Sequence, residues 1–123
     1  MDVVTYDVLY NVLKKLPLAR GMKDDEIKEL AYYIVNFFGY GDRIIDNILT
    51  PEDRHVFIML EELGVLRAYE EEVTVARGKL WRIHYWVYRK HNIEKILRGE
   101  YNKKEGKKRE SNIYDQVFRE VKF

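Results

Sequence analysis

The sequence predicts an α+β protein that is mainly α-helical, with a helical bundle followed by a β-hairpin and a short closing helix. Apolar residues recur at three- and four-residue spacing through the first half of the chain, as is typical of helices that pack one face on a core. Two later segments, rich in aromatic and β-branched residues, flank Gly78 and predict the hairpin. At 123 residues the chain is long enough for one core but not for two.

The first two helices are predicted from their apolar stripes. The first begins at Thr5, a good N-cap residue, and ends before Pro17. The second has an acidic first turn and ends at Gly39, which can adopt the left-handed C-cap conformation. The two stripes consist of Val4, Val8, Leu9, Val12, Leu13 and Leu16, and of Ile27, Leu30, Ala31, Ile34, Val35 and Phe38.

The third helix has the clearest local signals. Thr50 as N-cap, Pro51 at the first helical position and Asp53 three residues past the cap form a capping-box arrangement, and Gly64 ends the helix. Residues 42–49 are too short for an independent element, so we expect one or two helical turns there. Val56, Met59, Leu60 and Leu63 should face inward, and Arg54, His55, Ile58, Glu61 and Glu62 outward.

A three-residue loop fixes the register of the hairpin. With Ala76, Arg77 and Gly78 in the loop and Gly78 in the left-handed conformation, Val75 lies opposite Lys79. A two-residue loop would set glutamates beside Tyr85 and Ile83, which a buried face would resist. Over residues 69–75 and 79–88, the preferred register pairs Val73 with Trp81, Glu72 with Arg82, Glu71 with Ile83, Glu70 with His84 and Tyr69 with Tyr85.

This register divides the segment WRIHYWVYRKH (residues 81–91), which alone suggests a nucleic-acid surface. Arg82 and His84 are explained as cross-strand partners of glutamates. Trp86 and Tyr88 are not explained by pairing, and we expect the closing helix, the terminal segment or a partner subunit to cover them. The side expected to cover the helices consists of Tyr69, Val73, Val75, Trp81, Ile83, Tyr85 and Val87.

The chain is predicted to have three parts. Residues 1–98 form one domain that closes with a helix over residues 90–97, and residues 99–112 form a flexible basic linker. Residues 113–123 form a segment that docks on its own chain or binds a partner, and its apolar spacing fits both a helix and a strand.

The composition of the chain excludes several classes of protein and of site. The chain has no cysteine, which excludes disulfides, zinc–thiolate sites and thiol catalysis. The N-terminus lacks the pattern of a secretory signal, and no apolar run approaches the ~20 residues that cross a bilayer, so we expect a cytoplasmic protein without membrane contact. Ten tyrosines and many charged residues are typical of a thermophile.

Charge is divided unevenly along the chain. Residues 1–76 carry eight Lys or Arg against 15 Asp or Glu, a balance of −7. Residues 77–123 carry 14 against six, a balance of +8. This division indicates either a basic binding half or an attraction between two layers of the same molecule.

Two resemblances extend these predictions. A helix that ends in LEELGVL and is followed by a hairpin resembles a winged-helix domain over about residues 40–98. That resemblance implies a recognition helix at residues 51–63 and a wing at residues 70–88. GDRIIDNILTPEDRHVFIMLEELGVL and GKLWRIHYW resemble a small archaeal family of unknown function, which implies a shared fold and an archaeal origin but no activity.

The residues offer little support for catalysis. Ser111 is the only serine and lies in the linker, and the three histidines are scattered. Asp42 and Asp46 with Glu52 or Asp53 suggest a hard-metal site, but acidic residues in a first turn have a simpler capping role. We therefore expect a protein that is not an enzyme, with no catalytic residues, metal, cofactor or small-molecule substrate.

The predicted function is a winged-helix-like regulator, a homodimer that contacts nucleic acid weakly through its basic second half. Carboxylates on the expected recognition helix and on the first wing strand would repel phosphates. The residues expected to contact nucleic acid are Arg54, Arg77, Lys79, Arg89, Lys90, Lys103, Lys104, Lys107, Lys108 and Arg109. The alternative is a protein–protein interaction or dimerisation module with no nucleic-acid binding, whose interface consists of Ile58, Trp86, Tyr88, Val117 and Phe118.

Overall fold

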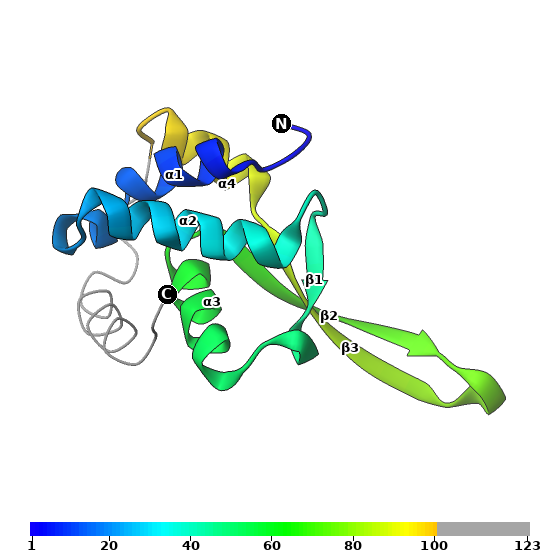
Figure 1. Ribbon diagram of the computed structural model, residues 1–123. Coiled ribbons are helices and arrows are strands. Elements are labelled where there is room, and N and C mark those ends of the chain that lie inside the picture. The colour runs from blue at the N-terminus through cyan, green and yellow to red at the C-terminus, as the bar shows by residue number, and fades with distance from the viewer. Residues whose placement is uncertain (101–123) are drawn as a thin grey trace.

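The computed structural model describes residues 1–100 and confirms the α+β class (Figure 1). Within these residues, helices pack on one end of a three-stranded antiparallel sheet whose strand order is β1-β3-β2. The elements are α1 (Tyr6–Lys14), α2 (Asp24–Phe38), β1 (Arg43–Ile45), α3 (Pro51–Glu62), β2 (Leu66–Thr74), β3 (Leu80–Tyr88) and α4 (Lys90–Leu97), with 3₁₀ turns at Pro17–Gly21, Asp46–Ile48 and Ala76–Gly78.

The predicted helix ends are confirmed by their capping contacts. The Thr5 hydroxyl accepts a hydrogen bond from the backbone N–H of Val8 at 3.3 Å, which satisfies a free donor in the first turn of α1. α2 ends at Gly39, whose φ is 57°. α3 has the expected capping box, since Thr50 and Asp53 each accept the other's backbone N–H at 3.1 Å.

The segment before α3 differs from its prediction. Only Asp46–Ile48 forms a helical turn, whereas Arg43–Ile45 forms β1 and pairs with β3. Ile44 lies opposite Trp86 and is buried with it. The spacing of the four apolar residues in this segment fits a helix, but so short a run cannot distinguish a helix from a strand that continues into a turn.

The predicted hairpin register is confirmed at every pair. β2 pairs with β3 from Leu66 opposite Tyr88 to Thr74 opposite Leu80, and the Val75 N–H donates to the Lys79 carbonyl at 2.8 Å. The loop adopts the left-handed conformation at Gly78, as predicted, and also at Arg77, with φ of 74° and 64°. β2 and β3 together form a hairpin arm that projects beyond the helices (Figure 1).

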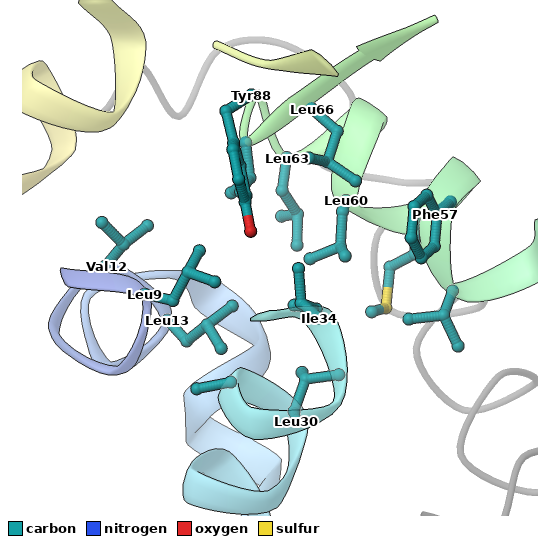
Figure 2. Close-up of a cluster of buried hydrophobic side chains, with 14 of the residues drawn as sticks. Leu9, Val12, Leu13, Leu30, Ile34, Phe57, Leu60, Leu63, Leu66 and Tyr88 are labelled. Carbon is teal, nitrogen blue, oxygen red and sulfur yellow. The ribbon is translucent and has the colours of Figure 1, made fainter. Parts of the chain in front are cut away.

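The hydrophobic core lies between the helices and the base of the sheet (Figure 2). α1 packs against α2 and α4, and α3 packs against β2. Each fully buried leucine or isoleucine contributes roughly 1.5–3 kcal/mol relative to an exposed one. The fully buried side chains include Leu9, Leu13, Leu30, Ile34, Phe57, Leu60, Leu63, Leu66, Ile93 and Ile96.

The side of the hairpin that was expected to cover the helices faces away from them. Leu66, Trp86 and Tyr88 belong to the core instead, and Trp81 is 60% exposed. The loop fixes which residues share a face, but the apolar residues at the base of the arm decide which face meets the helices. The assignment of Trp81, Ile83 and Val87 to the core is therefore wrong, whereas Tyr85 is buried but lies outside the main core cluster.

We call this uncovered side of the sheet the open face. None of its residues packs against the hydrophobic core. By strand alternation and register, its residues are Arg43, Ile45, Arg67, Tyr69, Glu71, Val73, Trp81, Ile83, Tyr85 and Val87.

One edge of the sheet is the long strand β2, and the other begins with the short strand β1. Its Ala68 N–H is satisfied by the Glu61 carboxylate of α3 at 3.0 Å. Glu70, Glu71 and Glu72 follow in succession along the same strand.

Candidate interaction site

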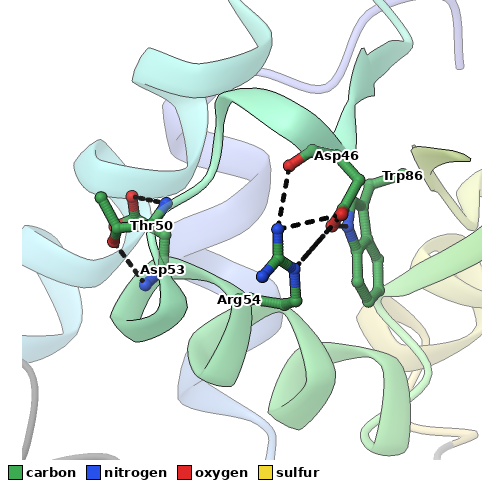
Figure 3. A network of polar contacts seen from close by, with 5 residues as sticks. All are labelled: Asp46, Thr50, Asp53, Arg54 and Trp86. Carbon is green, nitrogen blue, oxygen red and sulfur yellow. Dashed lines mark hydrogen bonds and ion pairs between the residues drawn. The ribbon is translucent and has the colours of Figure 1, made fainter.

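One carboxylate anchors the base of the hairpin arm to the helical body. Asp46 accepts hydrogen bonds from Trp86 Nε1 at 2.7 Å and from Arg54 Nε at 3.1 Å (Figure 3). These contacts join the Asp46–Ile48 turn, α3 and β3. Partial burial alone would raise the pKa of Asp46, but the hydrogen bonds from Arg54 and Trp86 outweigh it, and the pKa lies below its ordinary value.

A groove of about 360 Å³ lies beside this anchor. Its carboxylates already have partners, because Asp46 is held by Arg54 and Trp86, and Glu70 lies 3.3 Å from Arg82 and 3.8 Å from His84. Its lining residues are Asp46, Ala68, Tyr69, Glu70, His84, Tyr85 and Trp86. Within residues 1–100 no group of three or more His, Cys, Asp or Glu side chains could hold a metal ion.

At its base the open face is an ordered aromatic platform. The rings of Tyr69 and Tyr85 stack with their centroids 5.0 Å apart. The Arg43 guanidinium lies 4.6 Å from the centre of the Tyr85 ring and donates to the Tyr69 hydroxyl at 2.7 Å. Glu71 completes the group at 3.5 Å from Arg43. Tyr85 is thus buried by neighbours on its own face, and stacking, a hydrogen bond and an ion pair join the four side chains of the platform.

Further along the arm the open face is apolar and exposed. Trp81 is 60% exposed, and the half-buried side chains of Val73 and Ile83 share its face. Leu80, the residue before Trp81, points to the opposite side of the arm and is 65% exposed. Trp81 and Leu80 are therefore adjacent and similarly exposed, but they lie on opposite sides of the arm.

The cations expected to contact nucleic acid do not gather on one surface of the described residues. Arg54 is held by Asp46, and Lys90 forms an ion pair with Asp42 at 2.7 Å. Arg77 and Lys79 lie exposed at the tip of the arm, and Arg89 is exposed beyond its base, roughly 30 Å away along a nine-residue strand. Lys103, Lys104, Lys107, Lys108 and Arg109 lie outside the described residues.

The expected partner interface requires a correction. Trp86 and Tyr88 are only 5% and 6% exposed. Neither the closing helix nor a partner provides the aromatic rings that cover them, since Trp86 packs edge-on against Phe57 of α3 at 5.5 Å and Tyr88 stacks on Phe38 of α2 at 4.0 Å. Ile58 is exposed on α3, as expected.

The sequence predicted only part of the exposed surface. Val117 and Phe118 lie outside the described residues. The contributions of Arg43, Ile45 and Trp81 to an exposed surface were missed. One signal was present, because extension of the predicted register from Tyr69 back to Leu66 places Leu66, Trp86 and Tyr88 on one side of the arm, an apolar group at its base that indicates the core side.

The comparisons with known proteins give one match. A family model described as "Family of unknown function (DUF6015)" matches residues 2–123. The chain belongs to this family. The match includes residues 101–123, so the terminal segment is part of the same sequence unit as the helices and the hairpin.

The other comparisons found no match. Searches of curated proteins and of solved structures gave no significant similarity. In the part of the chain that the structure describes, no helix combines the length and apolar composition needed to span a membrane.

Proposed function

We propose that this member of the DUF6015 family is a protein-interaction module that binds its partner through the open face. The observation that supports this proposal is the exposure of Trp81 on an apolar sheet face that no described helix covers. A contiguous exposed apolar patch is characteristic of an interaction surface. Tryptophan is also among the residues that most often dominate binding energy.

The contacts among the side chains of the open face support the same proposal. Tyr69, Tyr85 and Arg43 are held by stacking and by a hydrogen bond before any partner arrives. Asp46 fixes the base of the arm relative to the helices. A surface that is already ordered loses little conformational entropy on binding, so more of the contact energy appears as affinity.

Single-cysteine probes can test this proposal, because the chain has no cysteine of its own. A benzophenone maleimide attached to Val73→Cys reports on the open face, and the same reagent on Thr74→Cys reports on the other side of the arm. After irradiation in an extract of the source cells, we expect a discrete protein adduct from position 73 but not from position 74. Equal labelling from both positions, or no adduct from either, would contradict the proposal.

A second candidate is a winged-helix-like regulator that contacts nucleic acid weakly. The observation that favours it is that α3 directly precedes the hairpin, whose tip presents Arg77 and Lys79 without an ion-pair partner among residues 1–100. The exposed face of α3 is less favourable, because it includes Glu52, Ile58 and Glu62. Both candidate functions are compatible with the archaeal origin and the cytoplasmic location that we infer from the sequence.

Nucleic-acid binding can be tested by fluorescence anisotropy with duplex DNA. We expect an affinity that falls steeply with salt and a smaller salt dependence in the double variant Arg77→Glu, Lys79→Glu, since each lost phosphate contact reduces the slope by about 0.9. The absence of binding even near 50 mM salt, where phosphate contacts are strong, would remove this candidate.

A further inference from the structure

The charges of the open face are arranged asymmetrically along its length. Arg43 and Arg67 lie at its base and Glu71 lies near its middle, whereas the distal part with Val73 and Trp81 is uncharged. Two copies placed face to face with their arms parallel would bring like charges together. With the arms antiparallel, the base of one copy lies against the distal part of the other, and each Arg67 lies opposite Val73 of the second copy, within reach of the Trp81 ring on the adjacent strand.

Such a contact is chemically favourable. A guanidinium over an indole ring is among the stronger cation–π pairs, and Arg67 is exposed at the base of the arm, where its guanidinium lies 5.9 Å from the centre of the Tyr69 ring on the same face. Antiparallel placement also brings Glu71 near Glu71 of the second copy, but each carboxylate is already balanced by Arg43 at 3.5 Å. The open face is therefore complementary to itself under a two-fold rotation.

The shape of the hairpin arm also favours a second copy of the chain as the partner. The hairpin arm is a ribbon roughly 30 Å long and about 10 Å wide, from the rise per residue and the strand spacing. Sheet faces pack with their strands aligned to within about 30°. A second ribbon of the same length and twist meets this requirement along the whole arm, whereas a globular partner would contact only a narrow strip.

The small area of the arm limits the strength of the contact. The arm offers about 300 Å² of flat surface per copy, well below the ~800 Å² per partner of a standard stable complex. An association of this size belongs to the weak class. We therefore expect a dissociation constant in the micromolar range or above, with Trp81 as the dominant residue.

We propose that the open face binds a second copy of this chain, so that two hairpin arms pack face to face and antiparallel in a weak homodimer. This inference rests on the proposed function, because it names the partner of the same surface. It also assigns Arg67 a role as the cation that packs on Trp81 of the second copy.

Adjacent residues of β3 provide a matched pair of variants. Trp81→Glu changes the open face and Leu80→Glu changes the opposite side, at positions that are 60% and 65% exposed. In sedimentation velocity from about 1 µM to 1 mM, a range that brackets weak complexes, we expect a monomer–dimer equilibrium for the wild type and for Leu80→Glu. We expect Trp81→Glu to remain monomeric, and circular dichroism should show that both variants keep the wild-type fold.

Arg67 provides a second, milder test. Arg67→Ala should weaken the dimer about fivefold through loss of the cation–π contact, whereas Arg82→Ala on the other side of the arm should leave the dissociation constant unchanged. The full-length double variant Val117→Glu, Phe118→Glu should still dimerise. Loss of the dimer in that variant but not in Trp81→Glu would assign the association to the terminal segment and overturn the inference.

The failure of this inference can be distinguished from the failure of the proposed function. A wild-type chain that is monomeric at every concentration overturns the homodimer. If Val73→Cys then still gives an adduct with a different protein in the extract, the interaction module stands with another partner. If it gives no adduct, both proposals fail.

Discussion

Trp81 and Trp86 lie five residues apart on the same strand and point to opposite faces of the sheet. Trp86 is 5% exposed and donates its indole N–H to Asp46, whereas Trp81 is 60% exposed on the open face. Successive side chains of a strand point to opposite faces, so two residues separated by an odd number of positions lie on opposite sides. One short segment thus supplies both an anchor for the core and the most exposed aromatic side chain of the arm.

Fluorescence of single-tryptophan variants can test this arrangement. Trp81→Phe retains the buried indole and should give a blue-shifted emission that acrylamide quenches weakly. Trp86→Phe retains the exposed indole and should give a red-shifted, strongly quenched emission at concentrations too low for association. The opposite result would mean that the two faces of the arm have been interchanged.

Loss of the Asp46 carboxylate should weaken the attachment of the arm. Asp46→Asn removes the charge that accepts hydrogen bonds from Arg54 and Trp86, and we expect the free energy of unfolding to fall by about 2 kcal/mol. Urea titration followed by circular dichroism measures the change. Asp25→Asn, in the exposed first turn of α2, is the control and should change stability by less than about 0.5 kcal/mol.

The pH dependence of stability should reflect the same carboxylate. The pKa of Asp46 in the folded state lies below its ordinary value, so the carboxylate contributes stability above its unfolded pKa of about 3.9 and loses it as pH falls through the folded pKa. The difference in unfolding free energy between wild type and Asp46→Asn should therefore shrink as pH falls from about 5 to 2. A difference that stays constant over urea titrations in this range would show that the charge is not responsible.

Tyr88→Phe should be neutral or stabilising. The Tyr88 hydroxyl is buried without a hydrogen-bond partner among the described residues, and burial raises its pKa. Its removal relieves an unmet desolvation cost, worth up to about 1 kcal/mol. Tyr33→Phe is the contrasting variant, since the Tyr33 hydroxyl donates to Asp53, and it should destabilise by about 1 kcal/mol. Thermal unfolding of both variants measures the contrast, and equal losses would imply that the Tyr88 hydroxyl has a partner.

Two glycines with positive φ should respond differently to alanine. At Gly64, with φ of 84°, a Cβ would lie 2.3 Å from Nδ2 of Asn92, which donates to the Gly64 carbonyl at 2.7 Å. Gly78 has φ of 74° and open space around it. We expect Gly64→Ala to cost about 3 kcal/mol and Gly78→Ala about 1 kcal/mol, because both strain the backbone but only the first also displaces the Asn92 amide and breaks its hydrogen bond. Denaturant midpoints measure both, and similar losses would contradict this explanation.

Much of the fold follows from local signals that the sequence contains. Thr50, Pro51 and Asp53 predicted the start of α3, and Gly78 predicted the register of the hairpin, because each of these features depends on neighbouring residues alone. β1 was missed because its three residues are too few to show a period and depend on pairing with a distant strand.

The candidate site was harder to predict, because it depends on which side of the arm meets the helices. Either side has enough apolar residues to cover a core, and the outcome is decided by Phe38 and Phe57, which pack on Tyr88 and Trp86 from other elements. Phe57 was not assigned to the interior, although it is fully buried. Tertiary contacts of this kind leave no local pattern.

The edge of β2 has a further consequence for how the molecule behaves at high concentration. An exposed strand edge is a template for adding further strands, and an exposed apolar face beside it increases that risk. Here Glu61 already occupies the Ala68 N–H, and edge-to-edge pairing would bring the three glutamates of one β2 against those of another. Like charges at that distance oppose growth of the sheet into a fibre, although apolar residues are exposed on the same arm.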